Sequence, residues 1–456
     1  MKEFSINALA RIIKAEPAGN IGSSITGVNI DSRTIKPGDC FFAIVGDNFD
    51  GHNYVKEAFA KGAACAVVSE NVEGGPILKV DDTVKALGDF ARHYRRHAGY
   101  KVVAITGSVG KTTTREIIYH VLSRHYRVSQ AHKNFNNQIG LPLTLLDAGQ
   151  ETQIVIAELG SSYPGEIAYL TRIALPDIAV ITSVYPAHLA GFGDLEAIIK
   201  EKLAISEGLQ TDGVLIINAD FDQLAGACRA KSSRPAVFYT FGKSEDCDYQ
   251  ALNVTNTGFG SRFTVDNTQV NLPLAGQGNV ENALAAWAVC SQFGLTIDDF
   301  AQAVKTQPAV SMRTELLQIG TLTVLNDCYN ANPASVKNAL DILAGLDSTQ
   351  KRRSVFICGD MAELGPQTEG LHAELGASIA RARVQLLITV GRLAKIAAEA
   401  AKTSAEYDLQ TKCFDDTLSA CNNLEDSIKD YDIILVKGSR TAKLELAVEK
   451  LKELFS

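Results

Sequence analysis

Residues 101–114 read K-V-V-A-I-T-G-S-V-G-K-T-T-T and predict a nucleotide-binding loop between a strand and a helix. The first residues form an apolar run typical of a buried parallel strand, and apolar residues recur at helical spacing from residue 117 onward. Gly107 and Gly110 allow backbone N–H groups to close on phosphate oxygens, and Lys111 adds a cation near the terminal phosphates. The loop is two residues shorter between its glycines than the general P-loop pattern.

Four further residues of this loop belong to the expected nucleotide site. The Thr112 hydroxyl is placed to bind Mg²⁺, and we expect the nucleotide to contact Ser108, Val109 and Thr113 as well. The helix that follows would point the positive end of its dipole at the phosphates. The alternative is a strand-turn-helix unit that carries its lysine by chance.

Composition limits the class of protein. The chain has 456 residues and a formal net charge of −8, which argues against a general nucleic-acid binder. No apolar run approaches the roughly 18 residues that cross a bilayer, and the N-terminus does not resemble a signal peptide, so we expect a cytoplasmic protein without membrane insertion. The nine cysteines include no C-x-x-C pair, which indicates reduced core residues and no zinc site.

The pattern of strands and helices predicts three α/β domains. Residues 1–98 mix short strands with amphipathic helices, and residues 99–310 alternate strands and helices as a doubly wound sheet does. Residues 311–456 resume this alternation, but their first strand leads into N-D-C-Y-N-A-N-P instead of a glycine-rich dinucleotide motif, which argues against NAD. The expected strands of the last two domains cover residues 154–159, 178–184, 213–218, 322–326, 354–358, 386–390 and 433–436.

Polar residues at strand ends are the next candidates, because ligands of such sheets bind beyond the carboxyl ends of the strands. Glu158 ends an apolar strand and can reach Mg²⁺, unless it simply faces solvent. His188 follows the next strand in the turn Y-P-A-H-L-A-G-F-G, where a structural or solvated histidine is an equally good interpretation. The two polar segments G-D-M-A-E-L-G and V-K-G-S-R also follow expected strands of the last domain.

Helical and loop residues give weaker signals. Lys202 stands beside Lys200, and this pattern alone favours a solvated charged face. Asn279 and Asn282 share a helical face and can read a purine edge, whereas capping of the helix is the alternative for Asn279. In the first domain, Ser32 and Arg33 of D-S-R-T-I-K-P-G-D can bind a diphosphate or a base, but a solvated turn is favoured locally.

Taken together, the motifs resemble those of the Mur ligase family. They are T-G-S-V-G-K-T-T-T, the loop K-N-F-N-N-Q-I-G-L-P-L-T-L-L (residues 133–146), A-H-L-A-G-F-G, M-R-T-E, N-D-C-Y-N-A-N-P and G-D-M-A-E-L-G. The resemblance runs the length of the chain. It implies a small N-terminal α/β module that binds a UDP-linked substrate, a central P-loop domain with a doubly wound parallel sheet, and a C-terminal Rossmann-like domain.

The resemblance also implies roles for single residues, with ATP and Mg²⁺ as cofactors. Catalytic roles fall on Lys111, His188, Lys202 and Arg313. The metal ligands would be Thr112 and Glu158 for one Mg²⁺ and His188 for a second, with Lys202 carbamylated so that it offers anionic oxygen. The nucleotide would contact Asn279, Asn282, Arg313, Asp327 and Tyr329, and the substrates would contact Ser32, Arg33, Asn136, Asn137 and Asn332.

Among the members of the family, the motifs are most similar to those of enzymes that join D-alanyl-D-alanine to UDP-N-acetylmuramoyl-tripeptide in peptidoglycan synthesis. The implied reaction forms an acyl phosphate that the dipeptide amine attacks, and we expect a monomer. The alternatives are another Mur or folylpolyglutamate-type amide ligase, or a nucleotide-dependent regulatory ATPase that is not a ligase. Hydride transfer by the last domain fits the motifs poorly.

Overall fold

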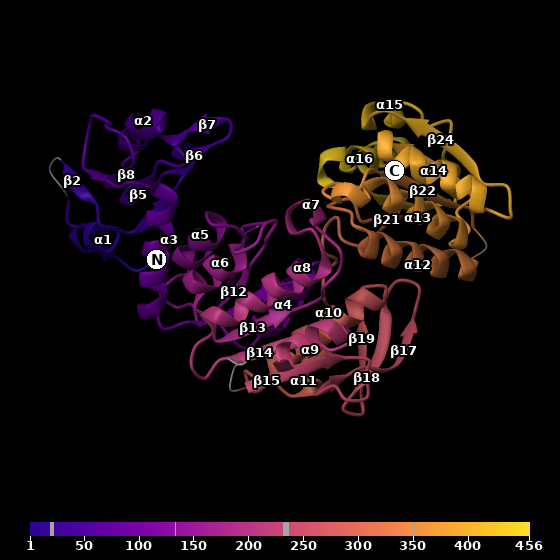
Figure 1. Ribbon diagram of the computed structural model, residues 1–456, viewed down its shortest axis with the longest axis horizontal. Coiled ribbons are helices and arrows are strands. Elements are labelled where there is room, and N and C mark those ends of the chain that lie inside the picture. The colour runs from indigo at the N-terminus through magenta and orange to yellow at the C-terminus, as the bar shows by residue number, and fades with distance from the viewer. Residues whose placement is uncertain (19–21, 133, 231–236, 351) are drawn as a thin grey trace.

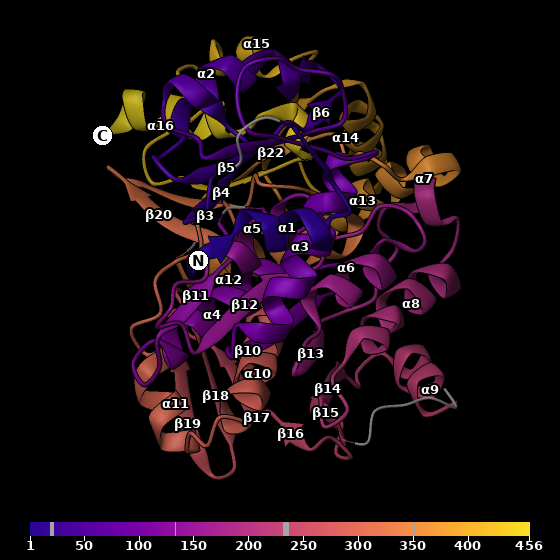
Figure 2. The same cartoon turned by 90° about the vertical axis from the view of Figure 1, so that its left-hand side faces the viewer.

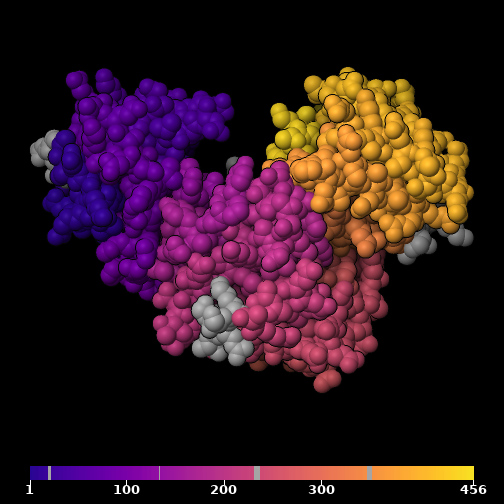
Figure 3. All heavy atoms as spheres, in the orientation of Figure 1, coloured from indigo at the N-terminus to yellow at the C-terminus, as the bar shows by residue number. Residues whose placement is uncertain are grey.

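The computed structural model describes residues 1–18, 22–132, 134–230, 237–350 and 352–456, and they form three α/β parts. In Figure 1 the N-terminal and C-terminal parts lie on opposite sides above the central part, and Figure 2 also places both above it. The space-filling view in Figure 3 shows open space between the indigo N-terminal part and the yellow C-terminal part.

The N-terminal part is built on a five-stranded sheet with the order β2-β9-β8-β5-β4. Its strands are β2 (Glu16–Ala18), β4 (Gly27–Asn29), β5 (Asp39–Phe42), β8 (Cys65–Val68) and β9 (Ile77–Lys79), with short antiparallel pairs β1 (Phe4–Ser5) with β3 (Ser24–Ile25) and β6 (Val45–Gly46) with β7 (Phe49–Asp50). Its helices are α1 (Ile6–Ile12), α2 (Val55–Ala60) and α3 (Thr83–His97), with 3-10 turns at Ser32–Thr34 and Gly51–Tyr54.

The central part contains the expected parallel sheet, with seven strands in the order β11-β12-β10-β13-β14-β15-β16. The strands are β10 (Lys101–Thr106), β11 (Val128–Gln130), β12 (Ile154–Glu158), β13 (Ile178–Ile181), β14 (Val214–Asn218), β15 (Val237–Gly242) and β16 (Tyr249–Gln250). The helices are α4 (Lys111–Leu122), α5 (Gly140–Asp147), α6 (Glu166–Ala174), α7 (Leu189–Phe192), α8 (Leu195–Leu203), α9 (Asp222–Ala230), α10 (Gln277–Ser291) and α11 (Ile297–Val304), with a 3-10 turn at Ala204–Gly208. An antiparallel sheet that the sequence did not predict adds β17 (Leu252–Asn256), β18 (Ser261–Val265) and β19 (Thr268–Leu272).

The C-terminal part has six strands in the order β20-β21-β25-β22-β23-β24, of which only the β20–β21 pair is antiparallel. The strands are β20 (Glu315–Ile319), β21 (Leu322–Asn326), β22 (Ser354–Gly359), β23 (Leu386–Val390), β24 (Gln410–Phe414) and β25 (Ile433–Lys437). The helices are α12 (Pro333–Gln350), α13 (Thr368–Arg381), α14 (Arg392–Ser404), α15 (Thr417–Cys421) and α16 (Glu445–Phe455), with 3-10 turns at Gly365–Gln367 and Arg440–Ala442.

One strand ends earlier than expected, for a reason that matters to the site. The apolar run at residues 178–184 predicts a longer strand than β13, which stops at Ile181. Thr182 and Ser183 instead turn their hydroxyls to the phosphate loop, where both donate hydrogen bonds to the Val109 carbonyl, at 2.6 and 3.0 Å. The side chains that follow the strand therefore brace the loop.

The N-terminal and central parts share a hydrophobic core. Helix α3 contributes Phe90 and Ala91 to a buried cluster that continues through Leu141 and Leu170 of the central part. The buried Arg95 also donates hydrogen bonds to the carbonyls of residues 174 and 175 and to the carboxylate of Asp177. The first two parts are therefore packed together, whereas most of the C-terminal core forms separate clusters.

In the described ranges, every helix is too short or too polar to pass through a bilayer.

Candidate active site

The phosphate loop lies at the carboxyl end of β10, which is flanked by β12 and β13, so the loop sits at the switch point of the central sheet. Gly107 and Gly110 have φ angles of 149° and 92°. A Cβ atom at these positions would lie 2.1 Å from the Thr182 hydroxyl and 2.2 Å from the Asn282 amide oxygen. Both glycines are therefore required by conformation and by space.

Lys111 is the first residue of α4 and folds back over the loop. Its ammonium donates a hydrogen bond to the Gly107 carbonyl at 2.6 Å. Burial lowers the pKa of Lys111 to about 8, while the Glu158 carboxylate opposes this shift and the Arg313 guanidinium adds to it. The two cations therefore act on the same site from the central and the C-terminal part.

Thr112 and Glu158 form the oxygen pair that the sequence predicts. The Thr112 hydroxyl donates to Glu158 Oε2 at 3.3 Å, and Arg115 Nη1 lies 2.9 Å from the other carboxylate oxygen, Oε1. Glu158 is 2% exposed, so the interpretation of a strand-end acid facing solvent was wrong. Arg115 supplies the buried countercharge that this carboxylate requires.

Lys202 is buried in α8, and the solvated charged face predicted by local pattern is wrong for this residue. It is 3% exposed, whereas its neighbour Lys200 is exposed. Its ammonium donates to the Ser161 hydroxyl at 2.6 Å and lies 5.6 Å from the centroid of the Phe192 ring. Burial, followed by repulsion from Lys111, lowers the pKa of Lys202 to about 7.

His188 caps the short helix α7 with a left-handed backbone, φ 53°. Its Nδ1 contacts the carboxylate of Glu363 in the C-terminal part, and the Ala190 N–H donates to the Glu363 carbonyl at 3.2 Å. Burial lowers the pKa of His188, while Glu363 acts in the opposite direction. The histidine is therefore part of the contact between the central and C-terminal parts.

Asn279 and Asn282 lie on one face of α10, as expected, but Asn279 does not cap the helix, because Gly276 is the N-cap. The Asn279 amide donates to the Ala275 carbonyl at 2.8 Å and to the Thr314 hydroxyl at 3.0 Å. The Asn282 amide donates to Asn279 Oδ1 at 3.3 Å. These amides thus connect α10 to the loop around Arg313.

The C-terminal residues of the predicted nucleotide site lie around the end of β21. The Arg313 guanidinium carbon lies 4.2 Å from the centroid of the Tyr329 ring. Asp327 accepts a hydrogen bond from the Thr314 N–H at 3.0 Å and pairs with the buried Lys437 at 2.5 Å.

One cavity of about 760 Å³ between the central and C-terminal parts brings most of the predicted residues together. Its lining includes Ser108, Val109, Gly110, Lys111, Thr112, Thr113, Asn136, Asn137, Glu158, His188, Asn279, Asn282, Arg313, Asp327, Tyr329 and Asn332. Lys202 and Gly107 do not line this cavity. Each is bonded to a residue that does: Lys202 donates to Ser161, and the Gly107 carbonyl accepts from Lys111. A second cavity of about 120 Å³ also borders His188, Asn330 and Asn332, so the two meet there.

Three asparagines predicted to bind the substrates, Asn136, Asn137 and Asn332, line the large cavity, and each holds a loop in place. Asn137 Oδ1 accepts the N–H groups of Ile139 and Gly140, and the Asn136 carbonyl accepts the Gly160 N–H. Asn332 Oδ1 accepts the Ser335 N–H at the start of α12. Lys133, the first residue of the asparagine-rich motif, lies outside the described residues.

Ser32 and Arg33 lie in the N-terminal part and line neither cavity. The Ser32 hydroxyl donates to Glu57 at 3.1 Å, and the exposed Arg33 pairs with Asp31 at 2.7 Å. The pKa of Asp31 is lowered to about 2, chiefly by its hydrogen bonds from the Arg33 side chain and backbone.

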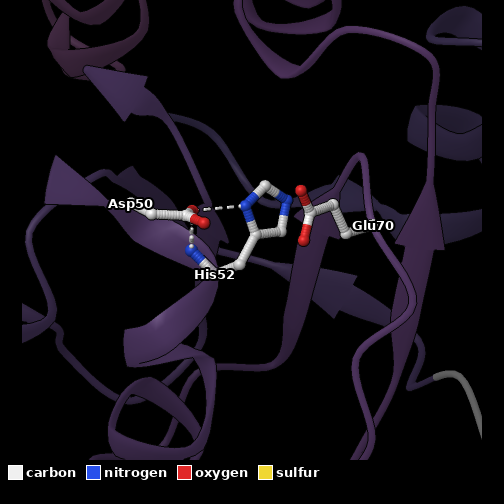
Figure 4. Close-up of side chains that lie close together, drawn as sticks. All are labelled: Asp50, His52 and Glu70. Atoms are coloured by element: carbon white, nitrogen blue, oxygen red, sulfur yellow. Dashed lines mark hydrogen bonds and ion pairs between the residues drawn. The ribbon is translucent and has the colours of Figure 1, made fainter. Parts of the chain in front are cut away.

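Nearby, Asp50, His52 and Glu70 bring metal-ligating groups together (Figure 4). His52 Nδ1 pairs with the Asp50 carboxylate at 2.6 Å, and Nε2 accepts the Ser69 N–H at 2.9 Å. Since both ring nitrogens have protein partners, this histidine holds the turn at residues 50–52 in place.

Sequence reasoning missed Arg115, Ser161, Glu363 and Lys437 as members of the site. Glu363 and Lys437 stand in G-D-M-A-E-L-G and V-K-G-S-R, whose position after strands was the available signal. Ser161 follows Glu158 by three residues, so its position shortly after a strand was the available signal for this residue as well. For Arg115 no local signal existed, because a charged residue on a helix is exposed by default.

Comparison with known proteins gives three family matches along the chain. The Mur ligase family catalytic domain matches residues 24–95, the Mur ligase middle domain residues 105–290, and the Mur ligase glutamate ligase domain residues 312–440. A UDP-N-acetylmuramoyl-tripeptide–D-alanyl-D-alanine ligase of Bacillus subtilis is 36% identical over 94% of this chain and 93% of its own length.

Two solved structures are also similar. MurF from Acinetobacter baumannii has a TM-score of 0.90 at 30% identity, and the match covers 99% of both chains. MurF ligase from Thermotoga maritima in complex with ADP has a TM-score of 0.82 at 26% identity, over 94% of this chain and 97% of that one.

Proposed function

The chain belongs to the Mur ligase family, and from this premise we propose that it joins D-alanyl-D-alanine to UDP-N-acetylmuramoyl-tripeptide, converting ATP to ADP and phosphate. The observation that carries the proposal is the large cavity, where the phosphate loop, Glu158, Arg313 and Asp327 converge. The proposal includes three domains, at residues 1–98, 99–310 and 311–456, acting as a monomer in the cytoplasm at one step of peptidoglycan synthesis.

The reaction has two steps at this cavity. The terminal carboxylate of the tripeptide attacks the γ-phosphorus of ATP, which gives an acyl phosphate and ADP. The deprotonated amine of D-alanyl-D-alanine then attacks the acyl carbon, and the tetrahedral intermediate expels phosphate. Lys111 and Arg313 stabilise the negative charge of the phosphoryl group in transfer, because both are cations beside the phosphate loop.

Thr112 and Glu158 fit a Mg²⁺ ion. They offer a hydroxyl and a carboxylate oxygen within 3.3 Å of each other beside the phosphate loop, which are the hard oxygen donors that this ion prefers. His188 would contribute to a second ion. When bound, Mg²⁺ neutralises phosphate charge; the protein's own part is to hold Glu158 in place through Arg115.

Lys202 fits carbamylation by carbon dioxide. An amine with a pKa of about 7 is largely neutral under physiological conditions and can attack the carbon of CO₂, losing a proton to leave an anionic carbamate. An ammonium cannot bind a metal cation, whereas a carbamate offers oxygen. Its position next to Ser161 places it beside the cavity wall.

The small cavity suits the acceptor dipeptide. It is lined by Ala187, Ala331 and Ala362 and by two residues that can bind a carboxylate, Asn332 and Arg440, of which Arg440 also pairs with Glu445 at 3.0 Å. The junction of the two cavities would then bring the acceptor amine to the acyl phosphate. Asn136 and Asn137 would face the acceptor or the peptide end from the central side of the large cavity.

The remaining assignments concern the two nucleotides. Asn279 and Asn282 would lie near adenine, Asp327 near the ribose and Tyr329 near the nucleotide, since all four line the large cavity. Ser32 and Arg33 would hold the UDP end of the substrate. Because they lie in the N-terminal part and line neither cavity, the substrate would extend from there to the large cavity.

A panel of UDP-linked peptides and amine acceptors, assayed for phosphate release, tests the function. We expect release only when UDP-N-acetylmuramoyl-tripeptide and D-alanyl-D-alanine are both present. Lys111→Ala should abolish it, whereas Lys200→Ala, which removes an exposed lysine, should not. An active Lys111→Ala variant would disprove the phosphoryl site.

A further inference from the structure

We propose that Lys437 is a positioning residue of this ligase: through Asp327 it holds the backbone of Thr314 and so aims Arg313 into the large cavity. The inference rests on the proposed function, in which Arg313 acts on the transferring phosphoryl group.

The loop that carries Arg313 has an unusual backbone. Its two neighbours, Met312 and Thr314, have φ angles of 58° and 46°, in the left-handed region that residues with a Cβ atom rarely adopt. Two carboxylates hold this conformation: Glu315 accepts the Met312 N–H and Asp327 accepts the Thr314 N–H, each at 3.0 Å. Without these acceptors the loop would relax to a more common conformation.

The direction of the Arg313 side chain follows from this loop. Its guanidinium stacks on the Tyr329 ring, with 4.2 Å between the guanidinium carbon and the ring centroid. The Tyr329 N–H in turn donates to the Met312 carbonyl at 3.2 Å. A change in the backbone at Met312 or Thr314 would therefore move the arginine relative to the ring that supports it.

Lys437 holds the carboxylate on which the loop depends. It ends β25, which pairs in parallel with β21, and Asn326 lies opposite Val436. Asp327 and Lys437 therefore leave neighbouring strands side by side. The ammonium is buried, 2.5 Å from Asp327 Oδ2 and 3.0 Å from the Asn330 carbonyl, and also donates to the Asp327 carbonyl at 3.4 Å.

These contacts engage all three protons of the Lys437 ammonium. If the lysine is removed, the Asp327 carboxylate loses its buried countercharge and turns away from Thr314. Lys437 also lines the large cavity, so direct binding of the nucleotide is the competing role. The two roles differ in whether the effect of Lys437 depends on Arg313.

A double-mutant cycle separates the two roles. We expect Lys437→Met to lower kcat at least tenfold and to weaken the Kd for ADP no more than Asp327→Ala does, because Asp327, the residue that Lys437 holds, is itself assigned to the ribose. In an Arg313→Ala background, adding Lys437→Met should lower kcat by less than a further twofold. Hydrogen exchange at residues 312–314 should become faster in Lys437→Met. Lys412→Met, which removes a half-buried lysine of β24 bonded to Ser427, is the matched control and should change none of these values.

The inference would be overturned, and Lys437 assigned to the nucleotide, if the losses in kcat multiply in the double variant or if Lys437→Met weakens the Kd for ADP at least tenfold more than Asp327→Ala does. If Lys437→Met does not fold, Lys437→Gln, which keeps an N–H donor, takes its place in the same cycle. Unchanged exchange at residues 312–314 in a folded Lys437 variant would also refute the inference. The ligase activity of the wild-type protein tests the proposed function separately, because the hydrogen-exchange result at residues 312–314 does not depend on whether the wild type is active.

Discussion

The environment of Lys202 leads to a quantitative prediction about its modification. Carbon dioxide reacts with a neutral amine only, and burial lowers the pKa of this lysine to about 7. At pH 8 such an amine is about 90% neutral, whereas a lysine with an ordinary pKa is about 0.4% neutral. The neutral amine, which is the form that reacts with carbon dioxide, is therefore about 200 times more populated at Lys202 than at an ordinary lysine.

The assay is ¹³C NMR of the whole protein in ¹³C-bicarbonate, recorded from pH 6 to pH 9. We expect a Lys202 carbamate resonance that grows as the pH rises through about 7, because the neutral fraction of Lys202 increases across this range. It should be absent in Lys202→Gln and unchanged in Lys200→Gln, which removes the exposed lysine two positions away on the same helix.

Activity gives a second measurement of the same group. Lys202→Ala should retain less than about one hundredth of the wild-type rate, since loss of a charged group that stabilises the transition state costs about 3 kcal/mol or more. Short carboxylic acids should restore part of that rate by filling the space with an anionic oxygen. A Lys202→Gln protein that keeps both the resonance and the wild-type rate would refute the reasoning.

Two further predictions concern stability and pH. Arg95→Met should lower the free energy of unfolding by about 3–5 kcal/mol, because it removes the buried partner of the Asp177 carboxylate and leaves the carbonyls of residues 100, 174 and 175 without their donor. Lys101→Met, which removes only the exposed partner of the same carboxylate, should cost at most about 1 kcal/mol. Urea unfolding measures both, and equal losses would contradict the difference in burial. Glu363→Gln should lower the pKa of His188 further, because the carboxylate favours the protonated ring; a histidine titration by NMR that shows an unchanged or higher pKa would contradict this contact.

Much of the strand pattern follows from local sequence. The strands at residues 322–326 and 386–390 are confirmed to the residue, because each is a mostly apolar run followed directly by a residue disfavoured in strands, Asp327 or Gly391. The run at residues 178–184 misled prediction, since Thr182 and Val184 have high strand propensity but Thr182 and Ser183 bind the phosphate loop instead. Tertiary contacts override propensity there.

Long-range contacts explain what local pattern missed in the site. Lys202 lies on a helix next to an exposed lysine, and only the packing of α8 on Ser161 and Phe192 buries it. Asn279 resembled a cap because its helix begins nearby, but its amide reaches Thr314 in a segment 35 residues later. Such pairings between residues far apart in the chain have no periodicity that a single sequence can reveal.

The most direct test of the account is product formation by the purified chain with ATP, UDP-N-acetylmuramoyl-tripeptide and D-alanyl-D-alanine, followed by mass spectrometry and by ADP release. We predict one UDP-N-acetylmuramoyl-pentapeptide for each ADP formed, and neither product when the tripeptide or the dipeptide is omitted. ADP release that continues at the same rate without both substrates, with no pentapeptide formed, would contradict the ligase assignment.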